Sequence, residues 1–202
     1  DDIELQQVLE APSSLTGTLH FGAGVARIGD QLFVGAPGAT VDGHDGAGVV
    51  VVYRAADDGW SFQSLLEAPT PSHNARFGVA LASDAGRLAI AAVRENDRGA
   101  VYLHDVTGDS IGTPQRLSSP TGDFFGSALD LEANRLAVGS SDETAGGHSD
   151  AGAAYLYEHD GSSWVEVERV TAPTPEEDAY FGSSVALEGD LLYVANYTAD
   201  DG

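Results

Sequence analysis

Apolar residues recur along this 202-residue chain at fixed distances from a repeated Phe-Gly pair. The pair begins at positions 21, 77, 125 and 181, a period of roughly 50 residues. The residues four, eleven and thirteen positions after each phenylalanine are apolar in every copy: Val25, Leu32 and Val34, then Leu81, Leu88 and Ile90, then Leu129, Leu136 and Val138, then Val185, Leu192 and Val194. Apolar residues two apart are typical of strands, and intervening polar pairs such as Gly29-Asp30 indicate tight hairpins.

A second module runs from a glycine to a proline and has one length in three copies. Gly48 to Pro69, Gly99 to Pro120 and Gly152 to Pro173 are each 21 positions apart. Each copy begins with a β-rich segment, passes a polar turn and ends in a further apolar segment. Length differences fall only between modules, as expected for packed strands with free loops, because an insertion within a strand reverses its two faces.

The two modules together predict a unit of four short antiparallel strands with a long loop between the second and third. Radial repetition of such units predicts an all-β fold, a β-propeller built from four-stranded antiparallel blades. We expect residues 1–202 to form a single propeller region, with repeats at approximately 21–69, 77–120, 125–173 and 181–202, the last of them incomplete. We also expect these repeats to belong to a larger ring, or to a ring that another chain completes.

The N-terminal segment matches the end of a repeat and not its beginning. Ile3 stands nine residues before Pro12 and Leu9 stands three before it, as the apolar residues near Pro69, Pro120 and Pro173 do. Residues 1–12 are therefore predicted to form the last strand of a preceding or closing blade.

Charge narrows the classes of partner. The chain has 32 Asp and Glu residues against nine basic residues, all of them arginine, and a formal net charge of −23. Nucleic acid is excluded as a partner, because phosphate binding requires basic groups. So acidic a surface repels itself in dilute buffer and suits high salt, which predicts a halophilic protein; the alternative is an ordinary acidic secreted domain.

Composition sets further limits on fold and location. Apolar residues make up 42% of the chain and charged residues 20%, which is typical of a globular protein. No apolar run approaches the length of a membrane helix, so we expect no membrane insertion within this chain. Cysteine is absent, which excludes disulfides and thiolate metal sites.

The Phe-Gly copies resemble the FG-GAP repeat family, which also forms the propeller head of integrin α chains. The resemblance rests on Phe21-Gly22 with Gly35-Ala36-Pro37, on Phe77-Gly78, on Phe125-Gly126-Ser127 and on the segment 181–187. It is greatest for the prokaryotic version, in which a strand like 99–102 follows the loop. The resemblance implies a secreted or cell-surface propeller that acts as a protein- or glycan-interaction module in adhesion or extracellular assembly, with other copies of itself among the expected partners. The resemblance implies the repeat type more narrowly than the function, because propellers serve many unrelated tasks.

Candidate metal ligands lie in two of the long loops. Integrin-type copies carry a calcium loop in the first hairpin, but the hairpin at 27–30 is too short to surround a cation. The longer loops each combine carboxylates with an imidazole: Asp42, His44 and Asp45 in the first, and Asp142, His148 and Asp150 in the third. Oxygen ligands suit Ca²⁺ or Mg²⁺, and a histidine with two carboxylates suits another divalent cation such as zinc. The alternative is a solvated acidic loop.

Two other function classes stay open. The carboxylates of Asp42, Asp45, Asp142 and Asp150 would suit a carbohydrate-active or other hydrolytic propeller enzyme if they converged across a cleft. A structural spacer in a larger surface protein is the third reading. No catalytic residue is predicted, because the Gly-x-Ser-x-Gly pattern around Ser110 lies in a strand-to-strand turn, not the strand-to-helix turn that activates a nucleophile. Asn196 begins a glycosylation sequon, in keeping with an extracellular or cell-surface location.

Overall fold

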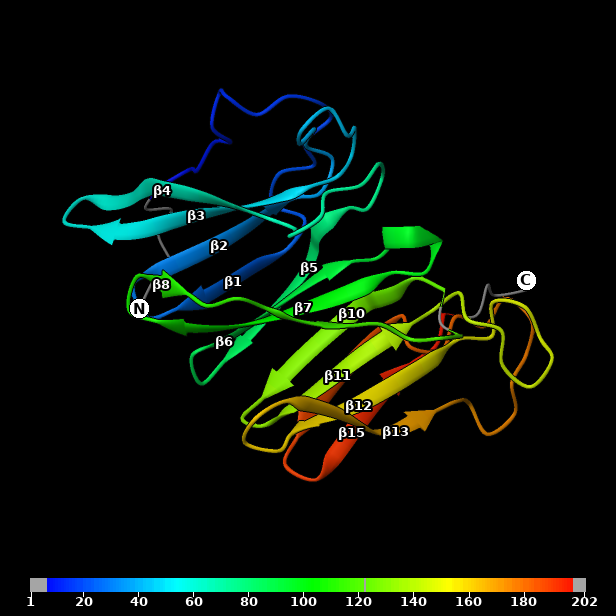
Figure 1. Cartoon of the computed structure of the whole chain (residues 1–202). Helices are drawn as coiled ribbons and strands as arrows, with labels where there is room; N and C mark the ends of the chain where they lie inside the picture. The colour runs from blue at the N-terminus through cyan, green and yellow to red at the C-terminus, as the bar shows by residue number, and fades with distance from the viewer. Residues whose placement is uncertain (1–6, 122, 198–202) are drawn as a thin grey trace.

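The chain forms four antiparallel sheets that follow one another in sequence order (Figure 1). The computed structural model describes residues 7–121 and 123–197. The first sheet contains β1 (Val25–Ile28), β2 (Gln31–Ala36), β3 (Val49–Ala56) and β4 (Gly59–Glu67). The second contains β5 (Phe77–Asp84), β6 (Arg87–Ala92), β7 (Ala100–Thr107), β8 (Ser110–Ile111) and β9 (Gln115–Leu117). The third contains β10 (Phe125–Glu132), β11 (Arg135–Ser140), β12 (Ala153–His159) and β13 (Trp164–Val170), and the fourth contains β14 (Ser184–Glu188) and β15 (Leu191–Ala195). The predicted all-β class is confirmed; within the described ranges, the helical content is one 3₁₀ turn, η1 (Glu95–Asp97).

The first hairpin of every sheet keeps one register relative to its Phe-Gly pair. The residue four positions after phenylalanine lies opposite the residue thirteen positions after it in all four copies: Val25 opposite Val34, Leu81 opposite Ile90, Leu129 opposite Val138 and Val185 opposite Val194. Apolar residues at both positions therefore share one face of the sheet, as the two-residue periodicity predicted.

The sheets stack face to face, and their first strands form the line of contact. β5 contacts β1 and β2, β10 contacts β5, and β14 contacts β10. Each interface encloses an apolar core: Phe33, Val50 and Ile90 lie between the first and second sheets, and Leu103, Leu131 and Val138 between the second and third. Burial of these alternating faces at about 25 cal/mol per Å² is the main term that holds the stack together.

A glycine at the start of each third strand lets the next repeat approach closely. The backbone N–H groups of Phe77, Phe125 and Phe181 each donate to a carbonyl just before that glycine, at 2.9 Å in every copy. Gly48 has a φ of +86°, and a Cβ added there would lie 2.3 Å from the carbonyl oxygen of Phe77. Any other residue would push the Phe-Gly segment away, so this glycine couples successive sheets.

Three strand boundaries do not follow from the repeat pattern alone. Residues 1–6 of the predicted N-terminal strand lie outside the described residues, and residues 7–12 form no strand. The fourth strand of the second repeat is divided into β8 and β9, because the backbone N–H of Gly112 bonds to the carbonyl of Asp105 and turns the chain out of the ladder. β1 begins at Val25, whereas β5 and β10 begin at the phenylalanine itself.

The N-terminal segment nevertheless contacts the first sheet as β9 contacts the third. The Gln7 side chain accepts from the backbone N–H of Trp60 at 2.7 Å and donates to its carbonyl at 3.1 Å. Gln115 of β9 makes the same pair of bonds with Trp164, both at 2.8 Å. Side-chain bonds thus place residue 7 where the preceding sheet's last strand would lie, without a backbone ladder.

Two sheets bury a glutamate from the loop between their second and third strands. Glu143 is 0% exposed and accepts hydrogen bonds from Tyr155 at 2.7 Å, from Thr121 at 3.2 Å and from Arg169 at 2.6 Å. Such burial is tolerated because the charge is paired and its oxygens are satisfied. In the third sheet this Glu–Tyr–Arg cluster links the long loop to β12 and β13.

The second sheet repeats the cluster with different neighbours. Glu95, 5% exposed, accepts from Tyr102 at 2.5 Å and from Arg116 at 2.8 Å. Tyrosine and arginine lie directly opposite each other on adjacent strands here, as Tyr155 and Arg169 do in the third sheet.

The first sheet has apolar residues at all three equivalent positions. Ala39 replaces the glutamate, since its carbonyl accepts from Gly48 N–H at 3.0 Å just as that of Glu143 accepts from Gly152 at 2.8 Å. Val51 and Leu65, paired in register, replace the tyrosine and the arginine. The polar cluster has therefore been exchanged as a whole for a small apolar one.

Candidate functional site

The long loop of the first sheet, between β2 and β3, is shaped by a tight turn. Val41 and His44 bond to each other in both directions, at 3.2 and 2.8 Å, and enclose Asp42 and Gly43. These two residues have φ values of 50° and 80°. An Asp-Gly pair is favoured in such a turn because both of its central residues need a positive φ. The predicted ligand Asp42 thus has a local structural role, and its side chain is exposed.

The loop is held against the connection that leads to the second sheet. Backbone N–H groups of Asn74 and Arg76 donate to the carbonyls of Asp45 and Gly46 at 2.8 and 3.0 Å. In the third sheet, Asp178 and Tyr180 make the equivalent bonds to Ser149 and Asp150 at 3.1 and 2.8 Å. This ladder continues to the next phenylalanine, so the long loop and the following connection form one unit.

The residue before each Phe-Gly pair has left-handed backbone geometry in all four copies. These residues are His20, Arg76, Phe124 and Tyr180, with φ values of 50°, 61°, 56° and 50°. A large side chain in this region is uncommon and costs conformational energy, which glycine would avoid. Residues held in such geometry cluster at ligand-contacting sites. This position, which the sequence analysis overlooked, carries a bulky side chain next to the long loops of the first three sheets.

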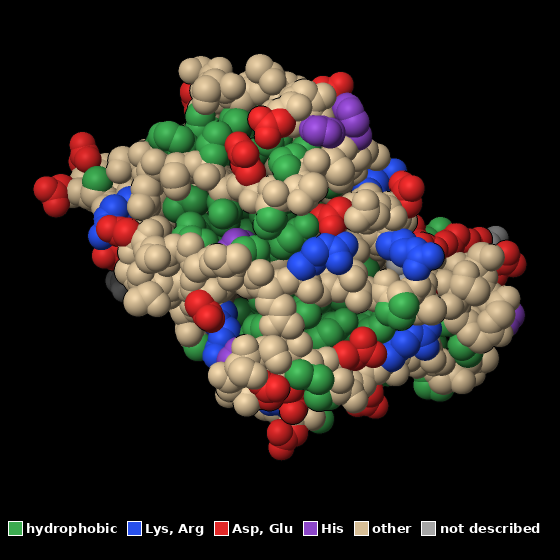
Figure 2. Space-filling model, viewed as in Figure 1, with side chains coloured by type: hydrophobic (Ala, Val, Ile, Leu, Met, Phe, Trp, Pro, Cys, Tyr) green, Lys and Arg blue, Asp and Glu red, His purple; other side chains and the backbone are tan. Residues whose placement is uncertain are grey.

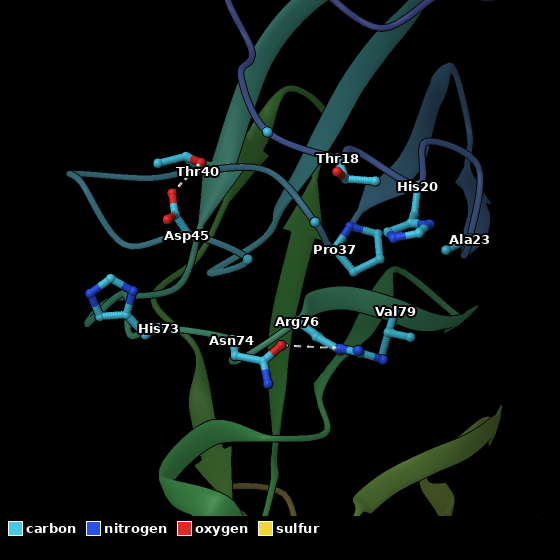
Figure 3. Close-up of a pocket in the computed structure, with 13 residues that line it drawn as sticks. Thr18, His20, Ala23, Pro37, Thr40, Asp45, His73, Asn74, Arg76 and Val79 are labelled. Atoms are coloured by element: carbon cyan, nitrogen blue, oxygen red, sulfur yellow. Dashed lines mark hydrogen bonds between the residues drawn. The ribbon is translucent and has the colours of Figure 1, made fainter.

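A pocket of about 940 Å³ lies where the first long loop meets the connections before β1 and before β5. Its walls combine small residues with polar side chains: Gly17, Thr18, His20, Ala23, Pro37, Gly38, Thr40, Asp45, Gly46, His73, Asn74, Arg76 and Val79. The volume falls within the range of small-molecule binding sites. Figure 3 shows Thr40, Asp45 and His73 on one side of the pocket, with His20, Arg76 and Val79 on the other.

Few hydrogen bonds join the polar side chains of the pocket to one another. Thr40 donates to Asp45 at 3.1 Å, and Arg76 Nε donates to the Asn74 side chain at 3.4 Å. The rings of His44 and His73 lie 4.9 Å apart, and His44 Nδ1 is buried with no hydrogen-bond partner among the described residues. Acidic side chains are spread over the face of the molecule in Figure 2, where histidine side chains also gather near the top. The pocket therefore offers donors to a ligand within an acidic surface.

The six predicted ligands fall into two groups, one on each loop. In the first loop Asp45 lines the pocket, His44 is half-buried behind it and Asp42 points to solvent. Among the residues that the structure describes, no three His, Asp or Glu side chains are arranged to hold a metal ion. Binding of Ca²⁺ or another divalent cation stays a prediction.

The second group lies on the long loop of the third sheet. Asp142 accepts from the Ser141 hydroxyl at 2.7 Å, and His148 is exposed in the turn that it forms with Ala145. Asp150 has a φ of 52°. Burial raises the pKa of Asp150 above its usual value, and the negative charges of Asp142 and Asp178 raise it further. These carboxylates repel one another and lie on a different sheet from Asp42 and Asp45.

Two further features bear on location. Asn196 is exposed, and Thr198 of the predicted sequon lies outside the described residues, so glycosylation stays a prediction. Within residues 7–121 and 123–197, no helix has the length and apolar character needed to cross a bilayer.

Comparison with known families bears on one part of the chain. The family described as FG-GAP repeat matches residues 164–202, which contain β13, β14 and β15 together with Phe181-Gly182. A search of curated proteins found no significant match. The match supports the resemblance for the last Phe-Gly copy; the prokaryotic type and the halophilic origin stay predictions. An FG-GAP repeat suggests an integrin-like interaction module, and domains with such repeats are generally non-catalytic.

Proposed function

We propose that the four sheets are blades of a β-propeller. The face-to-face stacking, the first strands in contact along one line and the common register of the hairpins support this architecture. The fourth sheet adds a further argument. Tyr193 is 49% exposed, whereas Phe33, its equivalent in the first sheet, is 0% exposed beneath the second sheet. A further sheet packed against β14 and β15 would cover Tyr193 in the same way.

The propeller is proposed to act as a secreted or cell-surface interaction module that binds an extracellular protein or glycan. The observation that carries this proposal is the pocket of about 940 Å³, built from three loop segments that a rigid stack of sheets holds together. Binding sites on loops positioned by a rigid scaffold are common, because loops vary freely while the scaffold keeps their geometry. The acidic surface would keep such a protein soluble in saline surroundings.

A pocket-blocking variant tests this proposal. Thr18→Trp places a large ring at an exposed pocket position, and Thr174→Trp places the same ring at an exposed position that does not line the pocket. Arrays of extracellular glycans and envelope proteins, probed at high salt, should give ligands that bind wild type and Thr174→Trp but not Thr18→Trp. Ligands that bind all three proteins equally, or an array with no ligand, would contradict a role for the pocket in binding.

A further inference from the structure

Arg76 differs in its charge pairing from most arginines of this chain. Five of the nine arginines form ion pairs with carboxylates: Arg54, Arg87, Arg116, Arg135 and Arg169. Arg76 is exposed and forms no ion pair within the described residues, although the chain contains 32 Asp and Glu residues. Its Nε bonds to Asn74, and its two terminal nitrogens have no hydrogen-bond partner in that part of the chain. They form the planar fork that carboxylates accept in two parallel bonds.

The backbone fixes where this guanidinium lies. Arg76 has a φ of 61°, and its N–H donates to the Gly46 carbonyl at 3.0 Å, between the equivalent bonds made by Asn74 and Phe77. Glycine would adopt this geometry at lower cost, yet the chain keeps a long cationic side chain here. These loop bonds fix the backbone of Arg76 before any ligand binds. Ligand binding therefore costs less conformational entropy at this residue.

The opposite wall suits hydroxyl groups. Asp45 and Thr40 present an acceptor and a hydroxyl 3.1 Å apart, and His73 stands beside them in Figure 3. Apart from Ala23, Pro37 and Val79, the lining consists of polar or glycine residues. An apolar ligand would leave these polar groups unpaired, which disfavours its binding. A ligand with one carboxylate and several hydroxyls would satisfy both walls.

We propose that this pocket binds an acidic saccharide through the carboxylate of a hexuronate unit, with Arg76 as the partner of that carboxylate. The proposal rests on the proposed interaction function and names the ligand class of the same pocket. His20 lies on the Arg76 side of the pocket, where a ring N–H can donate to the same ligand, while Asp45 and Thr40 bond to ring hydroxyls. An acidic peptide shares the carboxylate but lacks the hydroxyls that the second wall would bind.

The net charge gives this binding an unusual salt dependence. At −23 the protein repels an acidic saccharide at long range. Raising salt from about 0.1 M to about 1 M shortens the Debye length from about 10 Å to about 3 Å, which screens that repulsion more than a direct contact. Affinity for the saccharide should therefore rise with salt, whereas binding of an anion to a basic protein falls.

The test measures the affinity of fluorescently labelled oligogalacturonate at about 1 M salt by anisotropy. Its methyl ester, which removes the charge and keeps the hydroxyls, and an oligoglutamate peptide serve as parallel probes. Wild type should bind oligogalacturonate about tenfold or more tightly than either probe, since the ester loses a charge-assisted bidentate contact. Arg76→Gln should lose about the same factor. Arg54→Gln is the control, because it removes the same charge from a partly exposed arginine that does not line the pocket.

Arg76→Asn provides a second variant, because asparagine tolerates the left-handed backbone at this position. Both variants should keep the wild-type melting temperature and bind oligogalacturonate equally weakly. Equal binding of acid and ester, preferential binding of oligoglutamate, no binding of oligogalacturonate, or full binding by both Arg76 variants would each overturn the proposal. Loss of array ligands in Thr18→Trp would still support the interaction function in that event, so the two proposals fail separately.

Discussion

The first and third sheets fill the same three positions with side chains of opposite character, apolar in the first sheet and polar in the third. Their long loops have equal length and the same backbone bond to the third strand, but one sheet buries Ala39 where the other buries Glu143. The paired strand residues change with it, from Val51 and Leu65 to a tyrosine and an arginine. In the polar cluster the glutamate accepts hydrogen bonds from the tyrosine and the arginine. A set in which only some of the three residues were apolar would leave a buried polar group without its partner. The comparison indicates that these three positions function as one unit.

The largest effect is expected when the polar unit is broken in the third sheet. Glu143→Ala leaves the buried Tyr155 hydroxyl and the partly exposed Arg169 guanidinium without their shared acceptor. We expect the free energy of unfolding to fall by about 3–4 kcal/mol, because several hydrogen bonds to a charged, fully buried carboxylate are lost. Urea denaturation followed by circular dichroism measures the change. A loss no larger than that of an exposed substitution such as Glu166→Ala would show that the cluster contributes little.

The same substitution in the second sheet should cost less. Glu95→Ala removes the acceptor of two donor residues, Tyr102 and Arg116, whereas Glu143 accepts from three. We expect a fall in unfolding free energy of about 2–3 kcal/mol, below that of Glu143→Ala in parallel urea titrations. Equal losses in the two sheets would contradict this dependence on the number of donors.

Replacement of all three residues of the polar cluster together should restore much of the unfolding free energy that Glu143→Ala loses. The triple variant Glu143→Ala, Tyr155→Val, Arg169→Leu gives the third sheet the residues of the first. We expect it to lie about 1–2 kcal/mol below wild type, because no buried charge is left unpaired and the remaining cost is a packing defect. Denaturation of the triple and the three single variants measures the coupling. Additive single losses would refute the view that the three residues form a unit.

We expect the smallest change in stability when only the hydroxyl group of Tyr155 is removed. Tyr155→Phe should lower the free energy of unfolding by about 1 kcal/mol at neutral pH, the usual value of one hydrogen bond. Burial raises the pKa of Tyr155 above 10.0. Hydrogen bonds with Ser119 and Thr121 lower this pKa, and the Glu143 carboxylate raises it further. The folded state therefore holds this proton more tightly than the unfolded state. Its stabilising contribution is complete below pH 10.0 and is lost as pH rises toward the folded-state pKa.

Stability measured between neutral pH and about pH 11 should thus decline less steeply in Tyr155→Phe than in wild type. Tyr193→Phe removes an exposed hydroxyl that bonds to Glu188 at 3.2 Å and serves as the control. Parallel slopes for wild type and Tyr155→Phe would contradict the raised pKa.

Sequence periodicity predicted the hairpins well because local chemistry determines them. The apolar residues at Val25 and Val34, with Gly29-Asp30 between them, define a hairpin whatever packs against it. The N-terminal segment shows the limit of this reasoning. Its apolar spacing matches that of a last strand, but residues 7–12 form no ladder with another strand in the described chain, and the Gln7 side chain holds the segment instead.

The candidate site was only partly predictable. Loop composition identified Asp45, which lines the pocket, but also Asp42, whose role is the tight turn. His20, His73 and Arg76 were missed because they lie in connections far apart in the sequence and meet only when two sheets pack. A signal for two of them existed: a bulky residue precedes each Phe-Gly pair where the backbone is left-handed.

The sequence by itself determined the repeat, the strand register and the acidic surface, because each depends on residue type and short-range spacing. Only the tertiary structure decided that Glu143 and Glu95 are buried, and that Arg76 lies across a pocket from Asp45. A carboxylate's environment depends on which distant donors reach it, and a pocket depends on which loops converge. Neither property is local, so a single repeat cannot specify it.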